Sequence, residues 1–267
     1  MDLGLEGKLV VVTGSTSGIG LAIAQKFAAV GAHVVVNGRG DDNVKGAIQK
    51  IQANRPEAKL TGIAGDVGTA EGAEAFCTAV DALGQPLHVL INNVGIFGVK
   101  DFWDITNDDW QHTFDVNLFS NVRLCRHFLK QMLERNQGRI IMVASEAGVR
   151  IVSSMIHYSV SKTAQIGLAQ GLAQLTKGTK VTVNSVLVGP TWTEGVDKYI
   201  GGIAAQTGRT HEEEMKAYFA EREPSSLLQR FLTVEEVAAP IVFLASDAAA
   251  GINGSAQRVE GGIIRHI

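Results

Sequence analysis

Short apolar runs recur along the chain and alternate with stretches whose apolar residues follow a helical spacing. Apolar runs rich in valine and isoleucine are typical of strands buried on both faces, as in parallel sheets. Seven runs are expected to be strands, at residues 8–13, 32–37, 59–62, 87–91, 139–144, 180–187 and 256–259. Helical patterns lie between them at residues 18–30, 41–54, 69–83, 107–134, 158–177 and 233–246. This alternation predicts an α/β fold, a doubly wound (Rossmann-type) parallel sheet of about seven strands with helices on both faces.

One stretch, residues 189–230, interrupts this alternation. It contains the pair Gly201-Gly202, the sequence HEEE at residues 211–214 and the sequence PSS at residues 224–226. Such residues break strands and begin turns or helices. We interpret the stretch as a partly helical excursion over the edge of the sheet, and the whole chain, residues 1–267, as a single domain.

A glycine-rich segment, TGSTSGIG, joins the first expected strand to the first expected helix. Gly14 permits a sharp turn, Gly18 lets a phosphate group approach the backbone, and Gly20 lets the helix pack closely on the strand. The start of a helix also offers unpaired N–H groups and a partial positive charge. The segment is therefore predicted to bind the pyrophosphate of a dinucleotide; the alternative is a turn without a ligand. The residues between its glycines belong to the same candidate site, namely Ser15, Thr16, Ser17 and Ile19.

The end of the second expected strand bears on the choice of cofactor. In dinucleotide-binding folds an acidic residue near this point holds the ribose 2′-hydroxyl of NAD, whereas an arginine accepts the 2′-phosphate of NADP. Gly38 and Arg39 occupy this corner, and Asp41 and Asp42 follow shortly after. Since Arg39 can form paired hydrogen bonds to a phosphate, the sequence favours NADP(H) over NAD(H). The alternative is that Arg39 is a solvated turn residue.

The segment SEAGVRIVSSMIHYSVSK, residues 145–162, carries the candidate chemistry. Tyr158 and Lys162 are four residues apart at the start of an expected helix, so they share one face. Ser145 ends an expected strand, and ligands of open α/β sheets bind at the carboxyl ends of strands. A tyrosine hydroxyl is a weak base at neutral pH, but a nearby ammonium favours the phenolate and lowers its pKa. We expect Tyr158 to exchange a proton with a carbonyl or alcohol oxygen that Ser145 also holds, while a nicotinamide transfers the hydride.

These motifs together resemble the short-chain dehydrogenase/reductase family, in its compact single-domain branch. TGSTSGIG is similar to the family's TGxxxGxG, and YSVSK at residues 158–162 is similar to its YxxxK. The resemblance implies an NAD(P)-dependent oxidoreductase in which Tyr158 is the acid/base and Asn117 holds a water for a proton relay between Tyr158 and Lys162. The further cofactor contacts that it implies are Asp66, Val67, Asn93, Gly95, Tyr158 and Lys162.

One loop departs from the family's pattern. After the sixth strand the family usually has Pro-Gly, whereas here Val188 takes the position of the proline and Gly189 is kept. The resemblance implies that this loop contacts the nicotinamide amide, and Val188 can still offer a backbone N–H. Thr191 and Thr193 are the candidate contacts for the carboxamide and the pyrophosphate.

The family's corresponding loops cover the substrate, so residues 190–228 are expected to form a substrate lid on the dinucleotide-binding and catalytic domain. We expect a ketone of medium size and partly apolar character, such as a 3-oxoacyl thioester or a cyclic ketone. Glu146, which follows Ser145, is a candidate substrate contact, the alternative being a solvated loop residue. The other candidate substrate contacts are Phe97, Met155 and Trp192.

Composition and charge exclude several other functions. The formal net charge is −3 without a basic excess, so no nucleic-acid partner is expected. No stretch approaches the roughly 18 apolar residues of a membrane span, and the first residues lack the features of a signal peptide. Cys77 and Cys125 are too few for a disulfide framework, which fits a cytoplasmic protein. No histidines have the spacing of a metal site, so no metal is expected.

The sequence thus predicts an enzyme that interconverts a ketone and a secondary alcohol. The alternatives are a catalytically silent nicotinamide-nucleotide sensor or scaffold, and an epimerase or dehydratase that reuses a bound nicotinamide. The helical patterns at residues 107–134 and 158–177 have apolar residues on more than one face. Because the family commonly pairs such helices between subunits, a homo-oligomer, either a tetramer or a dimer, is expected.

Overall fold

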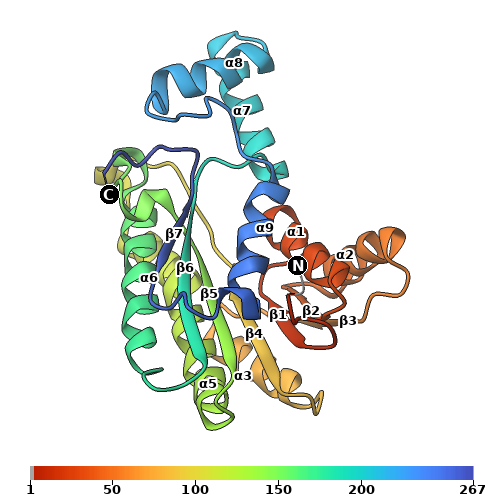
Figure 1. The fold of residues 1–267 in the computed structure, drawn as a ribbon. Coiled ribbons are helices and arrows are strands. Elements are labelled where there is room, and N and C mark those ends of the chain that lie inside the picture. The colour runs from red at the N-terminus through yellow and green to blue at the C-terminus, as the bar shows by residue number, and fades with distance from the viewer. Residues whose placement is uncertain (1–2, 267) are drawn as a thin grey trace.

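The computed structural model describes residues 3–266, in which seven strands form one parallel sheet (Figure 1). The strand order is β3-β2-β1-β4-β5-β6-β7, so the chain starts in the middle, runs to one edge and then crosses to the other half. Ligands of such sheets bind where the strand order reverses, here outside the carboxyl ends of β1 and β4. This confirms the predicted doubly wound, single-domain fold. The strands are β1 (Leu9–Val12), β2 (His33–Gly38), β3 (Leu60–Ala64), β4 (Leu87–Asn92), β5 (Gly138–Ser145), β6 (Val181–Val188) and β7 (Ala256–Val259).

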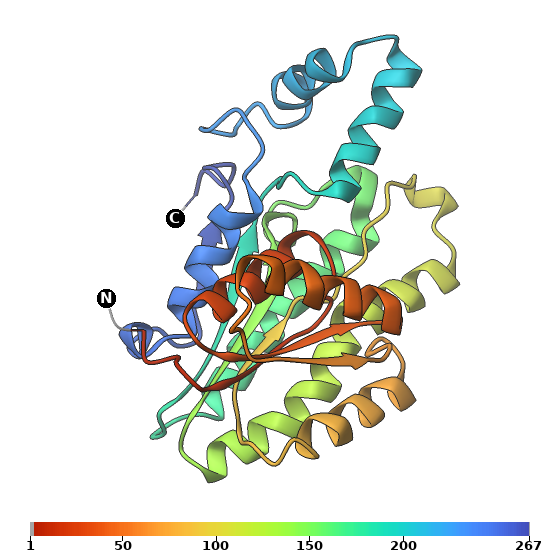
Figure 2. The ribbon, with the colours of Figure 1, turned by 90° about the vertical axis from the view of Figure 1, so that its right-hand side faces the viewer.

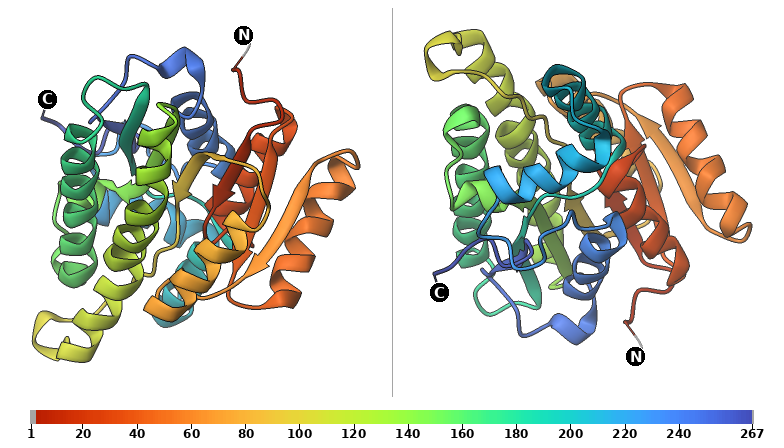
Figure 3. Two further views of the ribbon diagram at one scale, coloured as in Figure 1. Left: turned by 90° about the horizontal axis from the view of Figure 1, so that it is seen from below. Right: turned by 90° about the horizontal axis from the view of Figure 1, so that it is seen from above.

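Three helices cover each face of the sheet (Figure 3). One layer consists of α1 (Gly18–Ala29), α2 (Asp41–Asn54) and α9 (Val234–Leu244), and the other of α3 (Ala70–Asp81), α5 (Ser120–Glu134) and α6 (Ile156–Gln174). In β1, Val10 and Val12 face the first layer while Leu9 and Val11 face the second. None of these four side chains is exposed, which explains why the strands have unbroken apolar sequences.

The helix expected at residues 107–134 is not continuous. It consists of α4 (Asn107–Phe114), one π-helical turn (Asp115–Phe119) and α5. The extra residue of a π turn changes the direction of the side chains within it, and such turns are frequent at functional sites. Asn117 lies in this turn and is completely buried.

Beyond β6 the chain leaves the sheet and forms the α7–α8 segment, residues 190–228. It contains α7 (Glu194–Thr207), α8 (His211–Ala217) and a second π-helical turn (Tyr218–Arg222). The two helices stand away from the sheet at its carboxyl end (Figures 1 and 2). The ends of the segment are joined, because the backbone N–H of Trp192 donates to the carbonyl of Leu232 at 2.8 Å and that of Leu232 donates to the carbonyl of Pro190 at 2.9 Å. The segment has its own apolar cluster, in which Ile200 and Phe219 pack against Phe231, just beyond the end of the segment.

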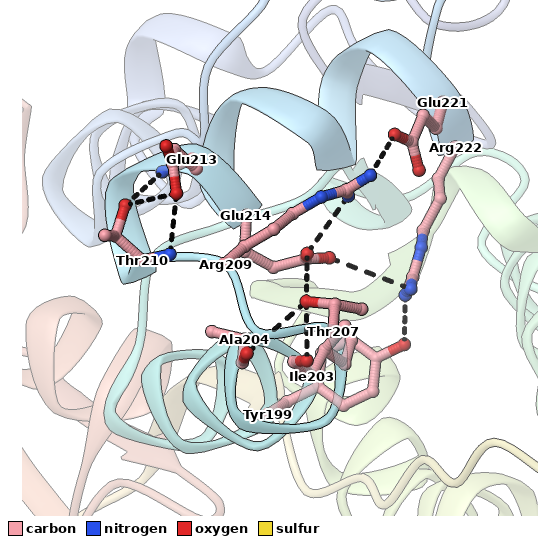
Figure 4. Close-up of polar contacts among 10 residues, drawn as sticks. All are labelled: Tyr199, Ile203, Ala204, Thr207, Arg209, Thr210, Glu213, Glu214, Glu221 and Arg222. Atoms are coloured by element: carbon pink, nitrogen blue, oxygen red, sulfur yellow. Dashed lines mark hydrogen bonds and ion pairs between the residues drawn. The ribbon is translucent and has the colours of Figure 1, made fainter.

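A buried carboxylate holds the two helices of this segment together (Figure 4). Glu214 of α8 is only 2% exposed, and its Oε2 accepts a hydrogen bond from the guanidinium of Arg209 at 3.2 Å. The Thr207 hydroxyl at the end of α7 lies 3.4 Å from the same oxygen, and the Arg222 guanidinium lies 3.9 Å from Oε1. Arg222 also donates to the Tyr199 hydroxyl at 2.8 Å. Glu214 therefore neutralises two cations that meet between α7 and α8.

Replacing this carboxylate by an amide should loosen the α7–α8 segment without unfolding the sheet. In Glu214→Gln both guanidinium groups lose a buried counter-charge, and because the arginines are partly exposed we expect a moderate effect. Amide hydrogen exchange at residues 194–222 should become about tenfold faster, with β1 and β5 unchanged. The matched control is Glu212→Gln, which removes an exposed carboxylate from the same helix. Equal exchange in the two variants would show that Glu214 does not hold the segment.

Candidate active site

A cavity of about 1170 Å³ opens at the carboxyl end of the sheet, next to the α7–α8 segment. It lies at the position expected for the ligand of a doubly wound sheet. It brings together residues from the predicted catalytic and cofactor sites, from the loop after β6 and from α7. The predicted site residues that line it are Ile19, Asn93, Gly95, Ser145, Tyr158, Lys162, Val188, Gly189, Thr191 and Thr193.

The loop between β1 and α1 has the shape of a phosphate cradle. Gly14 and Gly18 have positive φ angles of 61° and 52°, which favour glycine. At Gly20 an added Cβ atom would lie only 2.3 Å from the Gly14 carbonyl oxygen, so only glycine fits there. The Asn93 side chain donates to that same carbonyl at 3.1 Å and thereby fixes the loop. The side chain of Ser17, the N-cap residue, does not cap α1, so the helix start is available for a pyrophosphate and the residues present fit one.

Not every side chain of the cradle faces a ligand. The Ser15 hydroxyl is completely buried, donates to the Val12 carbonyl at 2.7 Å and accepts from the Asn37 N–H at 3.0 Å. Its side chain thus stabilises the loop, and only its backbone is left to approach a phosphate. Thr16 packs with its methyl group against Gly38, where an added Cβ would lie 2.5 Å from it. This contact places the end of β2 beside the cradle.

Arg39 and Asp66 do not line the cavity. Arg39 directly follows β2, is exposed, and has no ion-pair partner among residues 3–266. The Asp66 carboxylate accepts the Gly68 N–H at 2.9 Å, in the turn before α3. Val67 is buried in the core, so only its backbone can contact a cofactor. Arg39 is therefore a cation free to bind an added phosphate.

Ser145, Tyr158 and Lys162 come from β5 and the first turns of α6. Lys162 is 4% exposed and its ammonium donates to the Val143 carbonyl at 3.0 Å, which points it toward the end of β5. The same ammonium lies 5.7 Å from the centre of the Tyr158 ring. The Ser145 hydroxyl donates to a Glu146 carboxylate oxygen at 2.6 Å and accepts from the Ala147 N–H at 3.1 Å.

Asn117 connects α6 to the loop after β4. Its side chain accepts from the Ile96 N–H at 2.8 Å and donates to the Ile96 carbonyl at 3.0 Å and to the Ser161 hydroxyl at 2.9 Å. Its backbone carbonyl accepts from the amide groups of Asn121 at 3.0 Å and Gln165 at 2.5 Å. Asn117 therefore fixes the loop that contains Gly95, where an added Cβ would lie 3.3 Å from the Lys162 ammonium.

The electrostatics of the site differ from the sequence-based expectation. Burial and the neighbouring Glu146 carboxylate raise the pKa of Tyr158 well above its usual value, and the proximity of the Ser145 hydroxyl opposes them only in part. The sequence-based expectation that Lys162 lowers the pKa of Tyr158 is wrong for this arrangement, because burial of the hydroxyl has the larger effect and raises the pKa. Burial also lowers the pKa of Lys162 to about 8, with Glu146 acting in the opposite direction. Tyr158 is thus held as a protonated phenol and Lys162 remains largely charged at neutral pH.

The loop after β6 keeps its place although the usual proline is absent. Val188 is the last residue of β6, is buried, and pairs with Ser145 of β5 and Val259 of β7. At Gly189 an added Cβ would lie 2.6 Å from the Glu260 Cα, so glycine is required there. The strand pairing and this close contact hold the loop instead of a proline ring.

The two threonines after Gly189 have different positions. The Thr191 hydroxyl donates to the Gly189 carbonyl at 2.9 Å, within the loop itself. Thr193 is the N-cap of α7, and its methyl group would lie 3.4 Å from a Cβ added at Gly18. Thr193 thus lies against the cradle, as expected for a residue near the pyrophosphate.

Three of the four candidate substrate contacts line the cavity, namely Glu146, Phe97 and Met155. The Phe97 ring lies edge-on to the Tyr158 ring at 6.3 Å. Trp192 does not line the cavity: its ring packs against Phe231 at 5.2 Å, inside the apolar cluster of the α7–α8 segment. The prediction that Trp192 contacts the substrate is therefore not supported, because packing of the segment occupies its side chain.

Sequence reasoning missed a polar group in the same cavity. Arg150, in the loop after β5, donates to both carboxylate oxygens of Glu223 at 2.5 and 2.6 Å. Glu223 directly follows the second π-helical turn of the α7–α8 segment, so this ion pair connects the segment to the rest of the domain. Tyr218 lines the cavity beside them. The only sequence signal for Arg150 as a cavity residue is its position five residues after Ser145.

Among residues 3–266, no group of three or more histidine, cysteine, aspartate or glutamate side chains is arranged to hold a metal ion. No helix in this range is both long and apolar enough to cross a membrane.

Comparison with known proteins identifies the family. The family model described as short chain dehydrogenase matches residues 8–200. Over the full length of both chains, the sequence is 52% identical to the uncharacterized oxidoreductase YvrD of Bacillus subtilis. It is 31% identical to the 3-oxoacyl-[acyl-carrier-protein] reductase FabG of Aquifex aeolicus, over 98% of this chain and 100% of that one. The crystal structure of L-sorbose reductase from Gluconobacter frateurii, complexed with NADPH and L-sorbose, superimposes over 100% of both chains with a TM-score of 0.94 at 30% identity. The chain belongs to the short-chain dehydrogenase family and is an NAD(P)-dependent oxidoreductase that acts on CH–OH groups.

Proposed function

We propose that this enzyme reduces a ketone to a secondary alcohol with NADP(H), and that Tyr158 supplies the proton. One observation carries the proposal: Ser145, Tyr158 and Lys162 line the same cavity as Gly95 and Thr193, beside the glycine cradle. Chemistry and cofactor binding thus share one site at the carboxyl end of the sheet.

The bound nicotinamide would supply or accept the hydride. The chain's own residues would position the carbonyl and move the proton. Ser145 lies where its hydroxyl can hold the carbonyl oxygen, and Tyr158, kept protonated by burial, can donate its proton to that oxygen. The charged Lys162 stabilises the phenolate that remains. Because its pKa is raised, Tyr158 carries its proton at neutral pH, so it is in the form that reduction of a ketone requires.

The preference for NADP(H) is supported by Arg39. It is exposed, free of ion pairs within residues 3–266, and adjacent to the cradle through Gly38 and Thr16. The structurally similar L-sorbose reductase was crystallised with NADPH, which agrees with this proposal.

Further proposals concern the context of the site. Residues 190–228 would act as the substrate lid, since Tyr199, Tyr218 and Glu223 from this segment line the cavity.

The enzyme would be cytoplasmic and would form a homo-oligomer, a tetramer or a dimer, through α5 and α6. A 3-oxoacyl thioester and a cyclic ketone are both candidate substrates.

An activity assay tests the proposed function against its main alternative. The purified enzyme is mixed with NADPH and a panel of ketones, and the absorbance of the reduced nicotinamide is followed. We expect the absorbance to fall with at least one ketone, and more slowly when NADH replaces NADPH. Binding of NADPH, seen by fluorescence, without turnover of any ketone would favour a silent nucleotide sensor or scaffold.

A further inference from the structure

The residue after Ser145 places a second polar group at the reacting end of the cavity. Glu146 begins a 3₁₀ turn (Glu146–Gly148), is 7% exposed and lines the cavity. Its Oε2 lies 2.6 Å from the Ser145 hydroxyl oxygen, within one hydrogen bond of the group that would hold the reacting carbonyl. Glu146 is therefore within reach of the substrate atoms next to that carbonyl.

Among residues 3–266, no cation forms an ion pair with this carboxylate. Arg150 directs its Nη2 to both oxygens of Glu223. The Lys162 ammonium also acts on Glu146 electrostatically, but it donates to the Val143 carbonyl. Within the same range, Ser145 is the one side chain that donates a hydrogen bond to Glu146, and the backbone of Ala147 supplies a further contact. Burial raises the pKa of Glu146, and the nearby Glu223 acts in the same direction. A desolvated carboxylate with few partners is costly to a fold, which makes a ligand partner the simplest reason for its presence.

The chemistry of a carboxylate restricts what the substrate can present to it. An ionised carboxylate accepts hydrogen bonds and donates none. The carbonyl oxygen of a thioester is also only an acceptor, so against the ionised carboxylate a 3-oxoacyl thioester would place two acceptors face to face. A hydroxyl both donates and accepts, so it matches Glu146 in either protonation state. An alkyl group would leave the carboxylate without water or a donor. A hydroxyl group can donate to Glu146 and so satisfies it.

The distances indicate which carbon carries this hydroxyl. The reacting carbonyl oxygen would lie about 2.7 Å from the Ser145 hydroxyl oxygen, the usual length of an O–H···O hydrogen bond. Glu146 lies 2.6 Å from the same hydroxyl oxygen. Oxygens on adjacent carbons are separated by about one hydrogen-bond length. When the Ser145 hydroxyl turns its single O–H from Glu146 to the carbonyl, a hydroxyl on the neighbouring carbon can replace it as the donor to Glu146.

We propose that Glu146 is a specificity-determining residue that accepts a hydrogen bond from a hydroxyl group on the carbon next to the reacting carbonyl. The substrate class would then be α-hydroxy ketones, and the product a vicinal diol. This inference rests on the proposed function and deepens it. In the reaction the carbonyl carbon gains the hydride, the carbonyl oxygen gains the proton of Tyr158, and the nicotinamide is oxidised. The adjacent hydroxyl is unchanged and serves only in recognition.

A matched pair of ketones tests the inference. With NADPH, kcat/KM is measured for 1-hydroxy-2-butanone and for 2-butanone, and for acetoacetyl-N-acetylcysteamine as a 3-oxoacyl thioester. We expect the wild-type enzyme to favour the hydroxy ketone over 2-butanone by about 10- to 100-fold, as for a hydrogen bond to a charged group. In Glu146→Leu the ratio should fall to about one to threefold, and in Glu146→Gln it should be intermediate. The control Glu235→Gln, which removes an exposed carboxylate outside the cavity, should keep the wild-type ratio.

The ratio separates recognition from a structural role. If Glu146 only positions Ser145, both ketones lose activity equally in the variants and the ratio is unchanged, which overturns the inference. A wild-type ratio near one, or a preference for the thioester, overturns it while leaving the proposed ketone reduction in place. Absence of turnover with every ketone overturns both proposals.

Discussion

Replacing Tyr158 by phenylalanine should lower kcat for ketone reduction by about 10²- to 10⁴-fold, the usual contribution of a positioned proton donor. The change removes one oxygen atom, and the ring can keep its edge contact with Phe97 at 6.3 Å. The fold and the cradle are untouched, so the affinity for NADPH, measured by nucleotide fluorescence, should stay within about threefold. Steady-state oxidation of NADPH at saturating ketone measures the loss in kcat.

Tyr218→Phe is the matched control for this experiment. Tyr218 lines the same cavity, and burial raises its pKa as it does that of Tyr158. It lies on the α7–α8 segment and, within the described part of the chain, forms no hydrogen bond with Ser145 or Lys162, so its loss should change KM more than kcat. If Tyr158→Phe kept more than about a tenth of the wild-type kcat, the proton would have to come from another group.

Replacing Arg39 by alanine should lower kcat/KM for NADPH by about 10- to 100-fold, as expected for loss of a charge-assisted hydrogen bond to a phosphate. NADH lacks the 2′-phosphate, so kcat/KM with NADH should change by less than about threefold. The measurement is the ratio of kcat/KM with NADPH to kcat/KM with NADH, taken for both enzymes at low and at raised salt. The difference between wild type and Arg39→Ala should shrink at raised salt, because salt screens the charge of the arginine.

Arg55→Ala provides the control, because Arg55 is an exposed arginine at the end of α2, far along the chain from the cradle. It should leave the preference between the cofactors unchanged. An equal loss with NADPH and NADH in Arg39→Ala would mean that the arginine supports the cradle rather than binding the 2′-phosphate. No loss with either cofactor would identify Arg39 as a solvated turn residue.

Much of the fold could be predicted from the sequence, because each strand is buried on both faces. Burial of Leu9 on one face and Val10 on the other requires an unbroken apolar run, and such runs are visible without a structure. The glycines of the cradle and the spacing of Tyr158 and Lys162 are also local, so the sequence reveals them directly.

Features that depend on distant contacts could not be predicted in the same way. The π-helical turn at Asn117 inserts a single residue between two helical stretches, and a shift this small is not resolved in the apolar pattern of residues 107–134, which therefore indicated one helix. The pairing of Arg150 with Glu223 joins residues 73 positions apart. The raised pKa of Tyr158 is set mainly by burial, which the spacing to Lys162 does not reveal.

The joined ends of the α7–α8 segment have a consequence for how this enzyme can diverge. Trp192 and Leu232 are hydrogen-bonded where the chain leaves the domain for the segment and returns from it. This contact can hold the sheet and α9 in place whatever residues lie between Trp192 and Leu232. Closing a longer or shorter loop changes the free energy of folding only slowly with length. The segment is therefore a module that can be exchanged between related enzymes by grafting at its base. Such grafts would replace the cavity residues Tyr218 and Glu223 and retain the glycine cradle. Selection for new substrates therefore need not alter the binding of the nucleotide.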